Sequence, residues 1–161
     1  MPRKFRVLSF VILCCLAADA RCPEKRQFTA EDDHMQCPVP IPADVAAALL
    51  KDEHVLNALE AQEQPPDRLP ESWFTAAEVH LAGRRQKDLV VMADGRLRGA
   101  NVNMFWVFRS TDRGHRLVLS LPAHDLWITK RRWKGCRIIE AYKMSAVMLW
   151  TAGFRFDGEQ Y

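Results

Sequence analysis

Two histidines and one aspartate are the residues of this chain that come nearest to acid–base chemistry. Asp125 directly follows His124, and His115 lies nine residues earlier. Histidine titrates near neutral pH and a neighbouring carboxylate can fix its tautomer, so a small secreted hydrolase using His115, His124 and Asp125 is one interpretation. Adjacent residues of a strand point to opposite faces, however, which works against a His124–Asp125 pair. We therefore expect no catalytic residue and keep the hydrolase as the alternative.

Metal-binding motifs are absent from the sequence. The five histidines are scattered, and no Cys-x-x-Cys pair occurs. Ligand residues at short, regular spacing are the usual signature of a zinc site. We expect neither a metal nor a cofactor.

A basic segment, Lys130-Arg131-Arg132-Trp133-Lys134, is the strongest candidate binding site. Four cations could bind an acidic polymer of the cell envelope, with the indole stacking on a ring. The simpler interpretation is a solvated loop between two strands. Another envelope protein is the second class of partner, and nucleic acid is not expected.

The N-terminus has the three parts of a cleavable export signal. Cations at Arg3, Lys4 and Arg6 precede an apolar stretch, residues 7–18, which ends at Ala18-Asp19-Ala20. A retained membrane anchor is the alternative, but about a dozen apolar residues is short of the roughly 20 that span a bilayer. We expect cleavage after Ala20 and a periplasmic or extracellular mature protein with no membrane span.

The cysteines left after cleavage are Cys22, Cys37 and Cys136. Disulfides form in exported proteins, and three cysteines allow at most one in a monomer. We expect Cys22 to pair with Cys37, closing a small loop. A Cys37–Cys136 bond, which would staple the N-terminal segment to the body, is the alternative.

Charge is distributed unevenly along the mature chain. Residues 23–78 hold four Lys or Arg against twelve Asp or Glu, whereas residues 79–161 hold fifteen against seven. The two halves either dock on each other or leave a basic face for a polyanion.

The coarse pattern of elements predicts a single α+β domain over residues 44–161. Residues 21–43 form a proline-rich extended lead-in, and apolar residues then recur at helical spacing over 44–61, with a break at 51–53. Asp44 can cap the first turn of this helix. Prolines at 65, 66 and 70 end the helical region, 44–64, and begin a linker.

The region 72–161 shows short β-type runs separated by turn residues. The runs cover residues 73–81, 88–93, 104–109, 116–121, 126–129, 138–143 and 146–156. Turn signals at 112–114, 134–135 and 157–158 leave connections too short for helical crossovers, so we expect a mostly antiparallel β-sheet. Residues 105–108 are apolar on both faces, which indicates a central strand with the N-terminal helical segment packed on one side.

Residues 74–91 read Phe-Thr-Ala-Ala-Glu-Val-His-Leu-Ala-Gly-Arg-Arg-Gln-Lys-Asp-Leu-Val-Val and resemble one repeat of the FG-GAP or VCBS type. The resemblance implies a strand, an acidic loop that binds calcium, and a second strand. With residues 99–101, 105–108 and 154–161, about half of the chain also resembles a group of exported bacterial proteins. That second resemblance implies no activity.

The calcium loop of this repeat has lost its ligands. His80, Ala82 and Arg84 stand where acidic or amide residues belong, and of the expected pattern only Gly83 and Asp88 remain. Calcium takes about six to eight oxygen ligands. We therefore expect the loop to keep its shape without binding the ion.

Together these features favour an exported, non-enzymatic binding or interaction protein of the cell envelope. An inhibitor that inserts a loop into the cleft of a wall-degrading enzyme is one concrete version, by analogy with that class alone. The hydrolase with His115, His124 and Asp125 remains the alternative.

Overall fold

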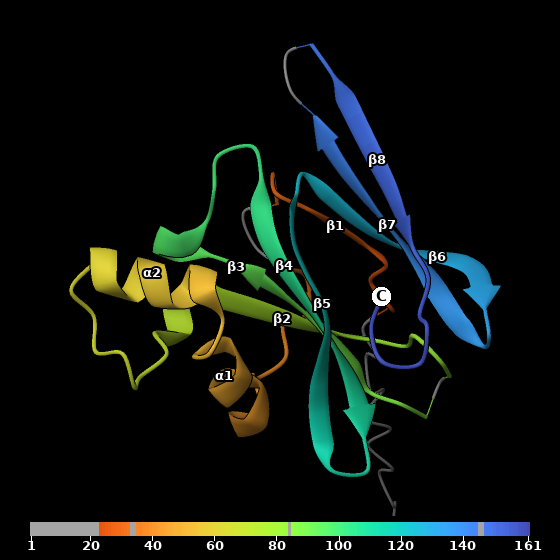
Figure 1. Ribbon diagram of the computed structural model, residues 1–161, viewed down its shortest axis with the longest axis horizontal. Helices are drawn as coiled ribbons and strands as arrows, with labels where there is room; N and C mark the ends of the chain where they lie inside the picture. Colours follow the sequence, from red (N-terminus) through yellow and green to blue (C-terminus); the bar gives the residue numbers. More distant parts are fainter. Residues whose placement is uncertain (1–22, 33–34, 84, 145–146) are drawn as a thin grey trace, which may run out of the picture.

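Two four-stranded antiparallel sheets and two short helices build the part of the chain that the computed structural model describes, residues 23–32, 35–83, 85–144 and 147–161. Figure 1 shows the helices on one side, one sheet in the middle and the second sheet on the other side. Within these ranges no helix has the length and apolar character needed to cross a membrane. The expected signal peptide, residues 1–20, and Cys22 lie outside them.

The two sheets differ in what covers them. The helix-covered sheet has the order β2-β3-β4-β5, and its strands are β2 (Phe74–Val79), β3 (Asp88–Ala93), β4 (Asn103–Thr111) and β5 (Gly114–Ala123). The hairpin sheet has the order β1-β6-β7-β8, and its strands are β1 (Gln27–Thr29), β6 (Asp125–Trp133), β7 (Cys136–Met144) and β8 (Leu149–Phe154). The helices are α1 (Ala43–Leu49) and α2 (Glu53–Ala61), and single 3-10 turns lie at Glu71–Trp73 and Gly95–Leu97.

The helix-covered sheet is apolar on both faces. Every residue of β3 is buried, and the central β4 points Trp106 and Phe108 to one face and Phe105 and Val107 to the other. Trp106 and Phe108 pack in one cluster with α1 and α2, whereas Phe105 and Val107 pack in another with the hairpin sheet. Two buried faces require two covering layers, which gives the three-layer order of helices, sheet and sheet.

Asp52 joins α2 to the centre of this sheet. One carboxylate oxygen caps the helix by accepting from the amides of His54 and Val55, at 3.0 and 3.3 Å. The other accepts from the indole N–H of Trp106 at 2.9 Å. A buried indole N–H needs such a partner. The break predicted at residues 51–53 is therefore the place where α1 ends and the capped α2 begins.

Asp44 does not cap α1 as its position in the sequence suggested. The N-cap residue is Pro42, and Asp44 in the first turn reaches across to β5, where its Oδ2 accepts from the amide of His115 at 2.6 Å. The imidazole Nδ1 of His115 lies 3.1 Å from the same oxygen. This contact fixes α1 against the start of β5.

The C-terminal residues return to β5. The amide of Tyr161 donates to the carbonyl of Val118 at 2.9 Å, and its hydroxyl donates to the carbonyl of Arg137 in β7. Burial raises the pKa of the Tyr161 hydroxyl above its usual range, so this group remains a donor at every physiological pH. The last residue therefore connects the two sheets.

The expected α+β class is confirmed in its coarser form, since the described residues form mostly antiparallel β-structure with two short helices, but three expectations differ from the structure. The strands form two sheets rather than one, because β5 leads into β6 through the single residue His124 and changes sheet there. The lead-in at 21–43 contains β1, which pairs with β6 over three residues. The turn signal at 157–158 follows the last strand instead of joining two strands.

The Asp44 contact predicts a dependence of stability on pH. The hydrogen bond from the His115 amide lowers the pKa of Asp44 in the folded protein. Its stabilisation is therefore present above the unfolded-state pKa of about 3.9 and is lost as pH falls through the lower folded value. We expect Asp44→Asn to lower the urea midpoint at pH 7, and the difference from the wild type to shrink toward pH 3.

Asp112→Asn, in the turn between β4 and β5, is the control for that measurement. Equal midpoints for the wild type and Asp44→Asn at pH 7 would show that the contact contributes nothing.

Candidate binding surface

The basic segment is not a loop. Residues 130–133 form the end of β6, and only Lys134 lies in the tight turn, with Gly135. The register between β6 and β7 shifts between Ile128 and Arg132. The five side chains therefore do not share one face.

Three of the five side chains hold the fold together. Arg131 forms an ion pair with Glu140 on β7. The Arg132 guanidinium donates to the carbonyl of Ala82 at 2.8 Å, and the ring of Trp133 lies 4.8 Å from the guanidinium carbon of Arg155. All four cations of the segment are exposed, and Arg131 and Arg132 also contact protein groups. Polyanion binding stays a prediction, and it no longer rests on five side chains that share one face.

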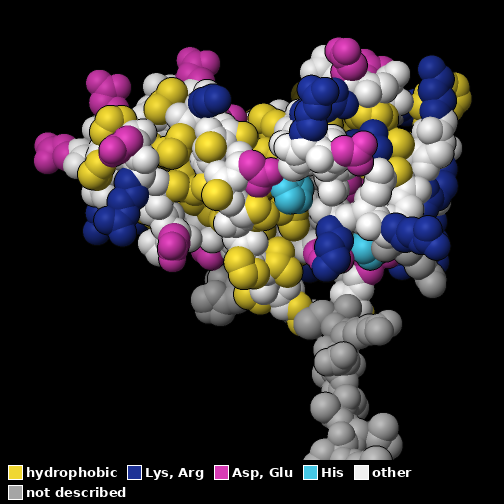
Figure 2. All heavy atoms as spheres, turned by 90° about the horizontal axis from the view of Figure 1, so that it is seen from below, with side chains coloured by type: hydrophobic (Ala, Val, Ile, Leu, Met, Phe, Trp, Pro, Cys, Tyr) yellow, Lys and Arg dark blue, Asp and Glu magenta, His cyan; other side chains and the backbone are white. Residues whose placement is uncertain are grey.

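Figure 2 shows how charge and apolar surface are distributed on one side of the molecule. Lys and Arg side chains are spread over the half that holds the hairpin sheet, and hydrophobic side chains form a patch over the half that holds the helices. Acidic residues of the first half of the sequence contact residues of the second half at several places, including Asp44 with His115, Glu24 with Arg137 and Glu78 with Lys87.

The structure separates the histidines of the hydrolase hypothesis. His115 is the second residue of β5 and His124 follows its last residue, so about 30 Å of extended strand lies between them. His124 does meet Asp125, with 3.4 Å between Nδ1 and Oδ1, and its Nε2 lies 3.4 Å from Glu31. The expectation that strand alternation would separate His124 from Asp125 fails because His124 lies in the bend between two strands.

Of the two cysteines among the described residues, one is disulfide-bonded and the other is free. Cys37 is disulfide-bonded, while Cys136 is free and buried. The alternative bond between Cys37 and Cys136 is therefore wrong. The pairing with Cys22 involves a residue outside the described ranges and stays a prediction.

Asp88, the surviving acidic residue of the calcium-type loop, accepts hydrogen bonds from the backbone. It is completely buried, and its two carboxylate oxygens accept from the amides of Leu81 at 2.8 Å and Ser110 at 2.9 Å. His80 closes the same loop through its Nδ1, 2.7 Å from the carbonyl of Gln86. Asp88 thus holds the loop to β4, and the absence of calcium binding remains a prediction.

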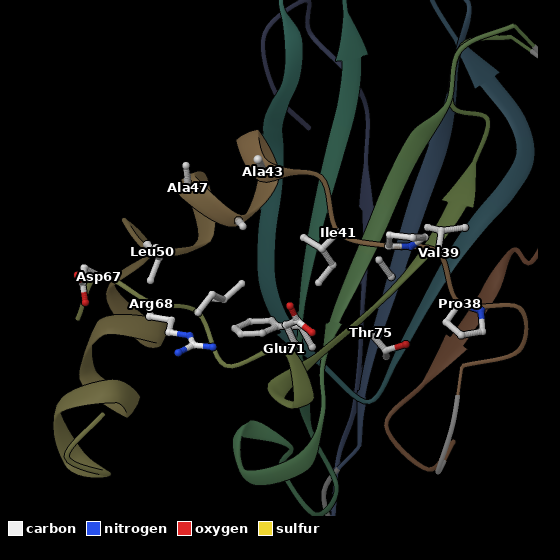
Figure 3. A pocket seen from close by; sticks show the side chains of 15 residues that line it. Pro38, Val39, Ile41, Ala43, Ala47, Leu50, Asp67, Arg68, Glu71 and Thr75 are labelled. Atoms are coloured by element: carbon white, nitrogen blue, oxygen red, sulfur yellow. The ribbon is translucent and has the colours of Figure 1, made fainter. Parts of the chain in front are cut away.

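A groove of about 640 Å³ lies beside α1. It is lined by the proline-rich segment 38–41, by α1 and by residues 67–71 (Figure 3), and Phe74 is also part of the lining. The lining is mostly apolar, with Asp67, Arg68 and Glu71 as its charged residues and no histidine, cysteine or serine. The groove can hold an apolar group, but it brings no nucleophile next to a base.

The β7–β8 hairpin carries the most exposed apolar surface. We call Met144, Val147, Met148, Leu149 and Trp150 the hairpin tip, and their exposed fractions are 59, 93, 68, 65 and 44%. The hairpin extends past the end of the helix-covered sheet in Figure 1. Large apolar side chains exposed together, rather than singly, mark interaction sites.

Aromatic side chains continue this surface along the uncovered face of the hairpin sheet. Trp127 is 37% exposed, and its ring lies 4.7 Å from that of Tyr142. Tyr142 is paired with Thr151 of β8, next to the hairpin tip. Exposed tryptophan and tyrosine are typical of protein interfaces.

Sequence reasoning placed residues 147–150 of the hairpin tip within a predicted strand, placed Met144 between two predicted strands, and missed the exposure of the tip. The run Val147-Met148-Leu149-Trp150 lacks the apolar–polar alternation of a strand with one buried face. Four consecutive apolar residues also fit a strand covered on both faces, and only the fold shows that this one is not.

Comparison of the chain with known protein families, with curated proteins and with solved structures finds no match. The resemblance to an FG-GAP or VCBS repeat remains a hypothesis.

Substitution of Arg132 tests directly whether its hydrogen bonds stabilise the fold. Arg132→Ala removes its hydrogen bonds to the loop at residues 81–82, so we expect it to lower the free energy of unfolding by about 1 kcal/mol. Lys130 is exposed and lies two residues before Arg132 on β6. Lys130→Ala should change the free energy of unfolding by less than about 0.5 kcal/mol. Urea unfolding of both variants makes the comparison, and equal effects would contradict a structural role for Arg132.

Proposed function

We propose that this chain is an exported, non-enzymatic binding protein that contacts a partner protein of the cell envelope through the hairpin tip. The observation that carries the proposal is the exposure of Val147, Met148 and Leu149, each at least 65% accessible, at the end of a protruding hairpin. Export rests on the signal-like sequence of residues 1–20.

The chemistry of the tip favours a protein partner over a lipid surface. No charged residue occurs between Met144 and Phe154, and Lys143 is the one cation that borders the tip at its base. Segments that lie on membranes usually combine apolar residues with several cations. Methionine and tryptophan, in contrast, are enriched where proteins bind other proteins, because the first adapts its shape and the second fills a pocket.

The distribution of acid–base groups supports a binding role rather than hydrolysis. His115 and His124 lie at opposite ends of β5, and the groove beside α1 contains neither of them. Asp44 is engaged with the backbone of β5. A hydrolase would need these side chains to converge on one cavity.

A pair of matched substitutions tests the proposal. Met148→Glu and Leu56→Glu each place a carboxylate at an exposed apolar position, the first on the hairpin tip and the second on α2, where Leu56 is 39% exposed. We expect the mature wild-type protein to capture a protein from envelope extract. Met148→Glu should reduce that capture by about tenfold or more, since a buried unpaired charge costs at least about 1.4 kcal/mol.

Thermal unfolding verifies that both variants are folded, and Leu56→Glu should capture the protein as well as the wild type. Equal capture by Met148→Glu would contradict the proposal. Co-flotation of the mature wild-type protein with anionic vesicles, lost in Met148→Glu, would also contradict it by assigning the tip to a membrane.

A further inference from the structure

Four strands form the edges of the two sheets, and they differ in what covers their outward-pointing backbone N–H and C=O groups. β2 is covered by the lead-in, because the amide of Val39 donates to the carbonyl of Ala76 at 2.9 Å. β5 is covered at its start by Asp44 and along its middle by Tyr161, whose amide donates to Val118. β1 is only three residues long. Each of these edges gives little opportunity for a further strand to pair.

β8 has none of these protections. Its pairing partner is β7, and no other described backbone hydrogen bond involves residues 149–154. Natural edge strands avoid unwanted pairing through charged residues, proline, bulges or short length. β8 reads Leu-Trp-Thr-Ala-Gly-Phe over six residues, its register with β7 is unbroken, and it contains no charge and no proline.

We propose that β8 pairs antiparallel with β8 of a second copy of this chain, which joins the two hairpin sheets into one continuous sheet. This inference goes beyond the proposed function, because it concerns the outward backbone edge of β8, although Leu149 and Trp150 belong both to β8 and to the hairpin tip.

A second copy suits this edge because the edge is complementary to itself. A two-fold axis perpendicular to the sheet places residues of the same face opposite each other. Residues 147–154 are all uncharged, so no register of this pairing brings like charges together.

The side chains of β8 select one register. Trp150, Ala152 and Phe154 share a face, since they lie opposite Lys143, Ala141 and Ile139 of β7. With Ala152 on the two-fold axis, Trp150 of each copy lies opposite Phe154 of the other. Aromatic pairs directly across two antiparallel strands are among the favourable cross-strand contacts. Gly153 offers room at the same junction, because a Cβ atom built there meets nothing within 4 Å.

The arrangement uses Trp150 of the hairpin tip in the dimer contact and leaves Val147 and Met148 outside it. Val147 and Met148 precede the paired residues, so the two hairpin tips of the dimer point in opposite directions along the joined sheet. The dimer would then present two binding sites.

Sedimentation equilibrium of the purified mature protein tests the pairing without any extract. Over about 1 to 200 µM, where a micromolar dimer dissociates, we expect the wild type to reach twice the mass of one chain. Thr151→Lys places a charge on the exposed face of β8 and should raise the dissociation constant at least about tenfold, since edge lysines oppose strand addition.

Gln27→Lys, at an exposed position of β1 on the other edge of the same sheet, is the matched control and should remain dimeric. A monomeric wild type at every concentration, or loss of the dimer in Gln27→Lys but not in Thr151→Lys, would overturn the inference. Because no partner protein is present, the result is independent of the capture experiment with Met148→Glu.

Cysteine cross-linking tests the register. Residues directly opposite in an antiparallel pair have Cα atoms about 4.5 or 5.5 Å apart, within disulfide range. Ala152→Cys should therefore form an intermolecular disulfide under mild oxidation, and Thr151→Cys should not. The reverse result would overturn the pairing of Trp150 with Phe154.

Discussion

The two apolar faces of the helix-covered sheet are the constraint on which the rest of the structure depends. Trp106 and Phe105 follow each other on β4, point to opposite faces and are both completely buried. α1 and α2 cover one of these faces and the hairpin sheet covers the other. The helices and the hairpin sheet therefore both pack on the helix-covered sheet. In the described part of the chain, no helix covers the outer face of the hairpin sheet (Figure 1).

The polar contacts follow from the same arrangement. Trp106 carries an indole N–H into the helix layer, and Asp52 accepts from it while capping α2. Asp44 connects α1 to β5, and Asp88 connects the loop before β3 to β4. These three carboxylates are bound to protein groups, so they hold layers together instead of forming a reactive site.

The extent to which the sequence predicted this structure depends on how local each determinant is. β3 was predicted at its observed bounds, because residues 88–93 are continuously apolar after Asp88 and are bounded by turn residues. The change of sheet at His124 was not predicted, since a single bend residue carries no turn signature. The basic segment was misplaced for a related reason: β6 continues through Trp133, and Arg131 and Arg132 find partners on β7 and in the loop at 81–82.

The candidate site could be predicted only with knowledge of which strand faces the other elements cover. An apolar run such as Val147–Trp150 is equally compatible with a buried strand and with an exposed tip. The fold distinguishes them, because the β7–β8 hairpin extends beyond the layer that would cover it. The exposed surface is therefore a consequence of packing elsewhere in the molecule and has no local signature.

Site-specific photo-cross-linking in cells that express the protein tests most directly whether the hairpin tip is its binding surface. A photoreactive residue at position 148 is compared with one at position 113, in the exposed turn between β4 and β5. The account predicts a discrete cross-linked protein from position 148 and none from position 113. Cross-linking from position 113 alone, or the same products from both positions, would contradict it.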